Sequence, residues 1–335
     1  MSVNLSRRAW LTGAARSPKV EGHWLHVHRT AMACRFEITV PDETPSAVEQ
    51  ASAALDLVTR LEARLSVFRG TSEVSTLNRD AAERPVVVES GLFSLIERCQ
   101  ALHAETEGAF DPTSGPLTRC WGFYKREGHV PDANALRAAL ASVGMQHVVL
   151  DRDQRTVRFG RPGVELNFGA IGKGYSLDLA VRLMQRRGVG AALACAGGSS
   201  VAALGRPPGL PGWIVSVRHP ARLDGAGTRV RLRDAHLATS GEREQWFAAD
   251  GKRYGHLLDP RNGAPVDAVR RVSVVASSGA EADALATAFF VSGVELARRY
   301  CAAHPEVAAI FYEDEADRPV VVGAHPRCRF EVVHE

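Results

Sequence analysis

The sequence predicts an α+β fold of mixed, mostly antiparallel sheets with packed helices, arranged as two intertwined subdomains. Two observations predict it. Segments with strand periodicity and segments with helix periodicity follow one another without the regular β-α-β alternation of a doubly wound sheet. No low-complexity stretch or linker divides the 335 residues, of which 45% are hydrophobic. We therefore expect residues 23–335 to form a single domain with a sizeable core.

In the N-terminal half, strands are expected where apolar residues alternate and helices where they recur every three to four residues. Ser90 is expected to cap the second helix and Gly108 to end it. The predicted elements are a strand at 35–40, a helix at 46–68, a helix at 89–108, a helix at 135–144, and a hairpin at 147–160 that turns near 151–154.

In the C-terminal half, the pattern begins with a helix around Tyr175 and then becomes rich in strands. A long helix follows, with a break after Gly293, and two strands close the chain. The predicted elements are a helix at 175–187, strands with a glycine turn at 191–205, strands at 213–220, 228–241 and 270–278, a helix at 279–293 continued at 294–304, and strands at 307–313 and 329–335.

The first 22 residues are expected to stand apart as an N-terminal segment. LSRRAWLTGAARS, residues 5–17, resembles a twin-arginine export signal, but its apolar part stops at Ala15, and neither a long apolar region nor a small-residue cleavage site follows. We interpret it as a degenerate or absent signal, which leaves a cytoplasmic and an exported location open. No run of about 18 apolar residues occurs elsewhere, so no transmembrane helix is predicted.

Charge and cysteine usage exclude some classes of protein. The 41 Lys and Arg against 38 Asp and Glu give a net charge of +3, and no basic stripe is interleaved with aromatic residues, so nucleic-acid binding is not expected. The six cysteines form no C-x-x-C pair and no cysteine-histidine cluster with zinc spacing. Buried free thiols are the expected state, and one or two disulfides remain an alternative for an exported protein.

A glycine-rich turn with a lysine, GAIGKG at 169–174, leads from a strand-like run into a helix-like run. It is not a nucleotide triphosphate loop, because Gly169 and Gly172 are only three residues apart and Gly174 replaces the hydroxyl residue that should follow Lys173. Backbone donors at the start of a helix and an ammonium group would still suit a phosphate or pyrophosphate. A left-handed cap beside a solvated lysine is the alternative interpretation.

The helix EADALATAFF carries an unusual polar pair. Asp283 and Thr287 are four residues apart, hence on one face, among Ala, Leu and Phe. Carboxylate, hydroxyl and carbonyl oxygens are ligands that Mg²⁺ prefers. The alternatives are a solvated face, or a Thr287 hydroxyl bonded back to a carbonyl of its own helix.

Residues 236–267 are dense in polar turn residues between apolar strands and are expected to form a hairpin with a long loop. His256 lies in a strand-like run there. It is either a structural histidine or a group that moves protons near neutral pH. Two similar D-P-x-x-G turns begin at Asp111 and Asp259, and turn chemistry is sufficient to explain both.

Taken together, these stretches resemble the FAD:protein FMN transferase (ApbE) family from about Met32 to Gly293. Each motif is weak alone, but the ordered set is specific. The motifs are LSVFRGTSEVSTLN, GAFDPTSGPLTRCWGF, LNFGAIGKGYSLD, ACAGGSSVAALG, ATSGEREQWF with YGHLLDPRNGAPV, and ADALATAFFVSG.

The resemblance implies a Mg²⁺-dependent enzyme that splits the pyrophosphate of FAD and attaches FMN to a Thr or Ser hydroxyl of an acceptor flavoprotein, releasing AMP. Two alternatives stay open: an FAD pyrophosphatase that gives FMN and AMP, and a flavin-binding protein without turnover. The partners implied are FAD and the acceptor flavoprotein.

The resemblance also implies roles for individual residues. Asp283, Thr287 and the Ala170 carbonyl match metal ligands, and Lys173 would neutralise charge on the pyrophosphate. His256 or Asp111 would act as the base. Phe68 and Phe110 would offer flat apolar surfaces to rings. Asn78 matches an asparagine near the adenine and metal site. The residues that match FAD-binding positions are Met32, Phe68, Asn78, Ala109, Phe110, Asp111, Asn167, Lys173 and Leu258.

Two departures from the family pattern stand out. Met-Ala-Cys at 32–34 replaces the usual Met-Gly-Thr, and Asn167 stands where many members have Asp. Losing that carboxylate is expected to weaken metal or flavin affinity, or to change the balance between transfer and hydrolysis.

Overall fold

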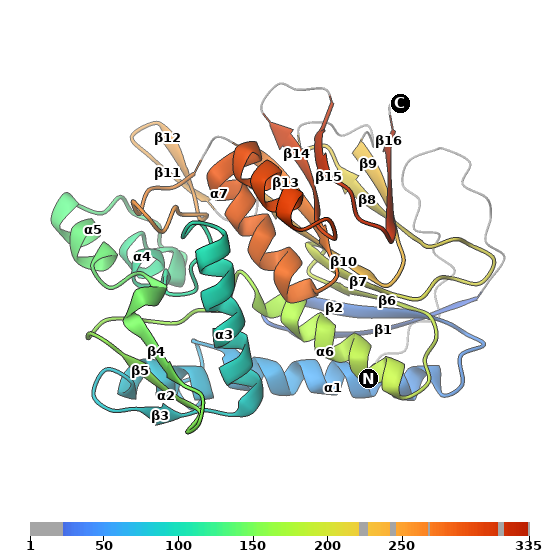
Figure 1. Cartoon of the computed structure of the whole chain (residues 1–335), viewed down its shortest axis with the longest axis horizontal. Coiled ribbons are helices and arrows are strands. Elements are labelled where there is room, and N and C mark those ends of the chain that lie inside the picture. Colours follow the sequence, from blue (N-terminus) through green and yellow to red (C-terminus); the bar gives the residue numbers. More distant parts are fainter. Residues whose placement is uncertain (1–22, 221–226, 242–245, 267–268, 314–317, 334–335) are drawn as a thin grey trace.

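The structure is a computed structural model of the whole chain and describes residues 23–220, 227–241, 246–266, 269–313 and 318–333. The predicted N-terminal segment, 1–22, lies outside these residues. The predicted α+β class is confirmed: helices and mostly antiparallel sheets are mixed along the chain (Figure 1). None of the helices in the described part is long and apolar enough to span a membrane.

The main sheet has eight strands, and each neighbouring pair in it is antiparallel. Strands far apart in the sequence are neighbours in the middle of this sheet, so its topology joins both halves of the chain. In spatial order the strands are β1 (Trp24–Ala31), β2 (Cys34–Pro41), β6 (Ala192–Ala196), β7 (Ser200–Leu204), β10 (Ala235–Gly241), β13 (Val269–Ala276), β14 (Ala308–Glu313) and β15 (Val320–Gly323).

Three smaller antiparallel sheets complete the β structure. They are β16 (Cys328–Val333) with β9 (Gly227–Leu232) and β8 (Trp213–Arg218); β3 (Val86–Val87) with β5 (Thr156–Phe159) and β4 (Val148–Asp151); and the hairpin of β11 (Trp246–Ala249) and β12 (Lys252–Gly255). The β4–β5 hairpin confirms one expectation from the sequence. Within 236–267 the hairpin is also present, but only Asp250 and Gly251 join its strands, so the expected long loop is not between them.

Three helices, α1, α6 and α7, lie along one face of the main sheet (Figure 1). The helices of the described chain are α1 (Ala47–Leu65), α2 (Glu73–Asp80), α3 (Ser90–Glu105), α4 (Gly115–Cys120), α5 (Ala133–Leu140), α6 (Gly172–Arg186) and α7 (Gly279–Ala303), with the short 3₁₀ turns η1 (Phe123–Lys125) and η2 (Met145–His147).

Both faces of the main sheet are buried, which explains why its central strands are almost continuously apolar. Val274 and Phe311 join the core between the sheet and the helices, whereas their chain neighbours Val275 and Ile310 join the core on the opposite face, with residues of β8, β9 and β16. Successive side chains of a strand point to opposite faces, so a sheet covered on both sides needs apolar residues at every position.

Several element boundaries differ from the sequence predictions. Helix α6 begins at Gly172 rather than near Tyr175, and α1 ends at Leu65 because Ser66 is extended. Glu89, not Ser90, caps α3, since its side chain accepts a hydrogen bond from the Gly91 N–H. The predicted break in α7 is confirmed by the left-handed backbone of Gly293.

Candidate active site

The GAIGKG turn is anchored by the residues that precede it. The side-chain amide of Asn78 donates to the Leu166 carbonyl and accepts from the Leu166 N–H, both at 2.9 Å. The Asn167 N–H donates to the Pro112 carbonyl at 2.7 Å, and its Oδ1 accepts from the Gly169 N–H at 2.9 Å. The structure therefore brings together Asn78, Asn167 and the segment beginning at Asp111, which lie far apart in the sequence.

Helices α6 and α7 meet at their first turns in a close backbone contact. A Cβ atom added to Gly174 would lie 1.9 Å from the Gly279 carbonyl oxygen, so only glycine fits there. The residue that rules out a triphosphate loop in the sequence is therefore explained by helix packing. We call this contact, formed by Lys173, Gly174, Asp178, Gly279 and Asp283, the α6–α7 junction.

Asp178, which was not predicted as a site residue, caps helix α7 from α6. Its carboxylate accepts hydrogen bonds from the N–H groups of Gly279 at 2.7 Å and Ala280 at 3.0 Å, and from the Ser278 hydroxyl at 2.9 Å. The two N–H groups are donors that the first turn of a helix leaves unpaired, and a carboxylate also suits the positive end of the helix dipole. His236 Nε2 lies 3.2 Å from the same carboxylate, and burial lowers the pKa of this histidine.

Asp283 is buried at the junction, with 7% of its surface exposed. One carboxylate oxygen accepts from the Gly174 N–H at 2.6 Å and the other from the Ser200 hydroxyl at 2.7 Å. Burial raises the pKa of Asp283, although the Lys173 charge and these two hydrogen bonds oppose that shift. The carboxylate is therefore fixed in place at the start of α6, where an additional cation would stabilise its charge.

Lys173 and Thr287 flank this carboxylate. The Lys173 ammonium donates to the Ser199 hydroxyl at 2.5 Å. The Thr287 hydroxyl donates to the Asp283 backbone carbonyl at 3.3 Å and lies 3.4 Å from the Ser240 hydroxyl. The bond back to its own helix is one of the arrangements expected for Thr287. With the Ser240 hydroxyl as a donor, one lone pair of the Thr287 oxygen is left available.

These residues fit a magnesium ion by the chemistry of their donors. Each oxygen of the Asp283 carboxylate accepts one of the hydrogen bonds described above and keeps a further lone pair, and Thr287 supplies a hydroxyl. The Ala170 carbonyl belongs to the turn that leads into α6. Such hard oxygen donors are the ligands that Mg²⁺ takes.

The predicted flavin and base residues separate into buried and accessible groups. The Phe110 side chain is 1% exposed and Ala109 is fully buried, so the expectation that Phe110 offers its ring to a ligand is wrong, because this ring fills the core. Leu258 is 8% exposed and packs in a cluster with Leu117 and Trp121. Ala109 and Phe110 are buried as whole residues, with their backbone atoms included.

Asp111 is occupied by local contacts. Its Oδ1 accepts from the Thr113 N–H at 2.8 Å and from the Thr113 hydroxyl at 2.6 Å, and its Oδ2 lies 3.3 Å from His103 Nδ1. Burial lowers the pKa of His103, but the hydrogen bond and charge of Asp111 outweigh it and raise that pKa overall. The carboxylate therefore holds a turn and pairs with a histidine, which is a structural arrangement.

Aromatic side chains around η1 are accessible in part. Phe68 is 70% exposed and stacks on Tyr124, with ring centroids 4.6 Å apart. The guanidinium carbon of Arg119 lies 3.9 Å from the centroid of the Tyr124 ring. His256 meets Phe123 edge to face at 6.5 Å. We call Phe68, Tyr124, Phe123 and His256 the η1 aromatic group.

Met32 lies beside α6, in the tight turn between β1 and β2. Its N–H donates to Glu62 Oε1 at 2.8 Å, and the Ser176 hydroxyl lies 3.7 Å from its sulfur. Met32 and Ala33 both have left-handed backbones, with φ of 49° and 57°. The usual glycine of the family motif would fit the second of these positions without strain.

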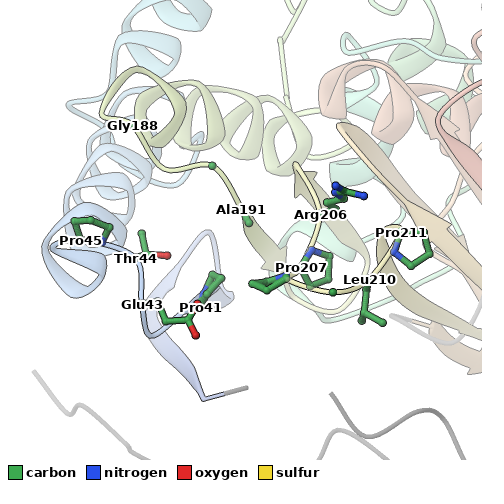
Figure 2. A pocket seen from close by; sticks show the side chains of 13 residues that line it. Pro41, Glu43, Thr44, Pro45, Gly188, Ala191, Arg206, Pro207, Leu210 and Pro211 are labelled. Carbon is green, nitrogen blue, oxygen red and sulfur yellow. The ribbon is translucent and has the colours of Figure 1, made fainter. Parts of the chain in front are cut away.

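A pocket of about 620 Å³ lies at the other end of α6 (Figure 2). Its walls come from the loops around 41–45, 188–191 and 206–211, which are rich in proline and glycine. Helix α6 has 15 residues and is therefore about 22 Å long, so this pocket is separated from the α6–α7 junction. None of the predicted site residues lines it.

Comparisons with known proteins show the family to which this chain is similar. The ApbE family model matches residues 32–311. A Klebsiella pneumoniae protein named FAD:protein FMN transferase is 34% identical over 288 residues, which cover 84% of this chain and 86% of that protein. A Treponema pallidum protein of the same name is 34% identical over 300 residues, covering 83% and 81%.

Solved structures show the same fold. The ApbE protein of Thermotoga maritima has a TM-score of 0.79 at 28% identity, covering 90% of this chain and 97% of that one. The apo flavinyl transferase ApbE of Pseudomonas stutzeri also has a TM-score of 0.79 at 28% identity, covering 90% and 95%. The resemblance inferred from the ordered motifs is confirmed, and this chain belongs to the ApbE family.

Proposed function

We propose that this chain transfers FMN from FAD to a Thr or Ser hydroxyl of an acceptor flavoprotein and releases AMP, with Mg²⁺ as cofactor. The observation that carries the proposal is the α6–α7 junction, where a buried carboxylate, a lysine and a helix N-terminus converge. Family membership and the names of the relatives support the same activity.

The junction supplies the charge that pyrophosphate cleavage needs. We assign Asp283, Thr287 and the Ala170 carbonyl to hold Mg²⁺, which when bound would neutralise pyrophosphate oxygens and the charge that develops on the leaving group. The Lys173 ammonium binds the same phosphates from the N-terminal end of α6, where the helix dipole also favours an anion.

In the transfer step the acceptor hydroxyl oxygen attacks the phosphorus of the FMN half of FAD. A new phosphoester bond forms, the bridging P–O bond breaks, and its electron pair leaves with AMP. The hydroxyl proton goes to His256, since imidazole accepts protons near neutral pH. We prefer His256 to Asp111 as the base because both oxygens of Asp111 are engaged by Thr113 and His103.

Flavin binding is assigned to accessible groups near the turn. Phe68 offers its exposed ring for stacking, and Met32 lies beside α6. Asn78 acts through the backbone, because both polar atoms of its side chain hold Leu166 just before the turn.

Asn167 keeps one function that an aspartate would have. Its Oδ1 accepts the Gly169 N–H, which a carboxylate oxygen would do equally well. We therefore expect Asn167→Asp to preserve the turn and to change turnover by less than about tenfold, as a single charge near the site would. Steady-state kinetics with FAD, together with the ratio of flavinylated acceptor to free FMN, tests this.

One assay tests the function. Purified protein is incubated with FAD, with and without Mg²⁺ and an acceptor domain, and flavins and AMP are followed by chromatography. We expect AMP and acid-stable, covalently bound flavin only when Mg²⁺ and acceptor are both present. FMN and AMP without acceptor would identify a pyrophosphatase. Unchanged FAD under all conditions, with several acceptors, would identify a flavin-binding protein and refute the proposal.

A further inference from the structure

We propose that three serines, Ser199 in the β6–β7 loop, Ser200 on β7 and Ser240 on β10, are positioning residues for this reaction, each holding one side chain of the lysine and metal site. The inference rests on the proposed function, because it assigns work to residues that surround the proposed lysine and magnesium ligands. None of the three serines was a candidate in the sequence analysis.

Ser199 holds Lys173. It is the last residue of the three-residue loop between β6 and β7, directly after Gly197 and Gly198, whose φ angles are 59° and 73°. That loop places the Ser199 hydroxyl 2.5 Å from the Lys173 ammonium. A long lysine side chain has many rotamers, so a fixed partner at its end reduces the entropy lost when it binds a phosphate.

Ser200 holds Asp283. The Ser200 side chain is 2% exposed and donates to Asp283 Oδ1 at 2.7 Å, while the Gly174 N–H donates to Oδ2. Two donors on different oxygens fix the plane of the carboxylate. The oxygens can then keep one orientation toward a cation, which a carboxylate held at a single atom would not do.

Ser240 holds Thr287. Ser240 is on β10 and Thr287 is on α7, and their hydroxyl oxygens are 3.4 Å apart. Strand β10 pairs with β7 next to the β6–β7 loop, and the Thr239 N–H donates to the Ser199 carbonyl at 2.7 Å. The three serines are therefore carried by one continuous piece of sheet and this loop. The sheet fixes their relative positions, and the side chains that they contact, Lys173 on α6 and Asp283 and Thr287 on α7, come from two different helices.

The expected effects differ between the three serines. Loss of a group that orients a metal ligand typically weakens metal binding by about 10- to 100-fold. We expect Ser200→Ala to weaken binding of Mn²⁺, used as a probe for Mg²⁺, by at least about tenfold, and Ser240→Ala by about threefold because its contact is longer. Ser199→Ala should leave Mn²⁺ binding unchanged and weaken metal-free FAD binding several-fold.

The experiment measures Mn²⁺ binding by electron paramagnetic resonance and metal-free FAD binding by flavin fluorescence, on the full chain. Ser273→Ala is the matched control, because Ser273 is a fully buried serine of the same sheet whose hydroxyl pairs with Thr239 rather than with a site residue. It should change neither affinity by more than about twofold, although it removes a similar hydrogen bond.

The two readouts separate positioning from a general loss of folding. A folding defect in Ser200→Ala would lower Mn²⁺ binding and FAD binding together, and that result would overturn the inference. The inference would also be overturned if Ser200→Ala bound Mn²⁺ with the same affinity as Ser273→Ala. Asp283→Ala tests the underlying assignment separately. If Asp283→Ala loses Mn²⁺ binding while Ser200→Ala keeps it, only the positioning role fails. If Asp283→Ala also keeps Mn²⁺ binding, the proposed metal site fails.

Discussion

The α6–α7 junction and the η1 aromatic group carry different parts of the proposed reaction and are built differently. At the junction, backbones touch, Asp283 is 7% exposed, and hydrogen bonds reach each oxygen of two carboxylates. In the η1 aromatic group, Phe68 is 70% exposed and its ring contact is a stack on Tyr124.

This difference matches the two chemical tasks. Stabilising charge on a pyrophosphate requires donors and cations that do not move during the reaction, and a buried, hydrogen-bonded framework provides them. Stacking on a flat ring depends on contact area and tolerates small displacements, so a partly exposed aromatic side chain is sufficient. Substitutions at the junction should therefore affect metal dependence and packing, whereas substitutions in the aromatic group should affect ligand affinity.

The largest effect is expected for Asp283→Ala. Removing the buried carboxylate removes the proposed anionic metal ligand, so turnover should fall at least about a hundredfold and the remaining activity should no longer depend on Mg²⁺. Initial rates over a Mg²⁺ titration measure both. Asp56→Ala, which removes a half-exposed carboxylate on α1, should leave the rate within about twofold. Full Mg²⁺-dependent activity in Asp283→Ala would contradict the distinction between the two regions.

Gly174→Ala tests the junction through packing alone. The new methyl group would meet the Gly279 carbonyl, so α6 and α7 must separate, at a cost of about 1–3 kcal/mol in the free energy of unfolding. Urea unfolding measures this cost. Gly172→Ala is the control on the same helix, because its Cβ would be 3.8 Å from the nearest atom, the Phe168 Cβ. Equal stability of the two variants would show that the helices are not in close contact.

Phe68→Ala should produce the opposite pattern. Because the ring is exposed, the free energy of unfolding should change by less than about 0.5 kcal/mol. Loss of one aromatic stack, worth about 0.5–1.5 kcal/mol, should weaken FAD binding by up to about tenfold. Fluorescence titration with FAD gives the affinity, and Phe68→Tyr should retain most of it. A variant that loses stability but not affinity would assign Phe68 to the fold instead.

The sequence predicted the junction's chemistry better than its packing. The spacing of Asp283 and Thr287 placed them on one helix face, and the turn with Lys173 was expected at a helix start. In the structure that turn begins α6, and the Gly174 N–H donates to the Asp283 carboxylate. The role of Gly174 depends on Gly279, which lies 105 positions later, and no local pattern reveals such a contact. Asp178 was missed for the same reason, since the helix end that it caps belongs to α7.

Residues with the same role in the family motifs differ in how far they are buried in the structure. Phe68 and Phe110 were both expected to offer rings to the flavin, yet one is exposed and the other fills the core. Among whole elements, the sequence missed α2, in which only Val74 and Leu77 are buried, because such a polar helix has no continuous apolar stripe. Long, strongly periodic segments such as α7 were predicted well, including the break at Gly293.

The smallest effect is expected for Ala33→Gly, in the turn that places Met32 beside α6. The left-handed backbone of Ala33 costs about 1–2 kcal/mol, which glycine would not cost. Glycine also gives the unfolded chain more conformational freedom, which destabilises the folded state by about 0.4–1 kcal/mol. The free energy of unfolding should therefore stay equal or rise by up to about 1.6 kcal/mol in urea titrations. Ala248→Gly, at an exposed strand position of the β11–β12 hairpin with no left-handed backbone, should instead lower it by about 0.5–1 kcal/mol. If both variants lost the same stability, the backbone at Ala33 would carry no strain, and the departure from the family's Met-Gly-Thr would have no energetic consequence.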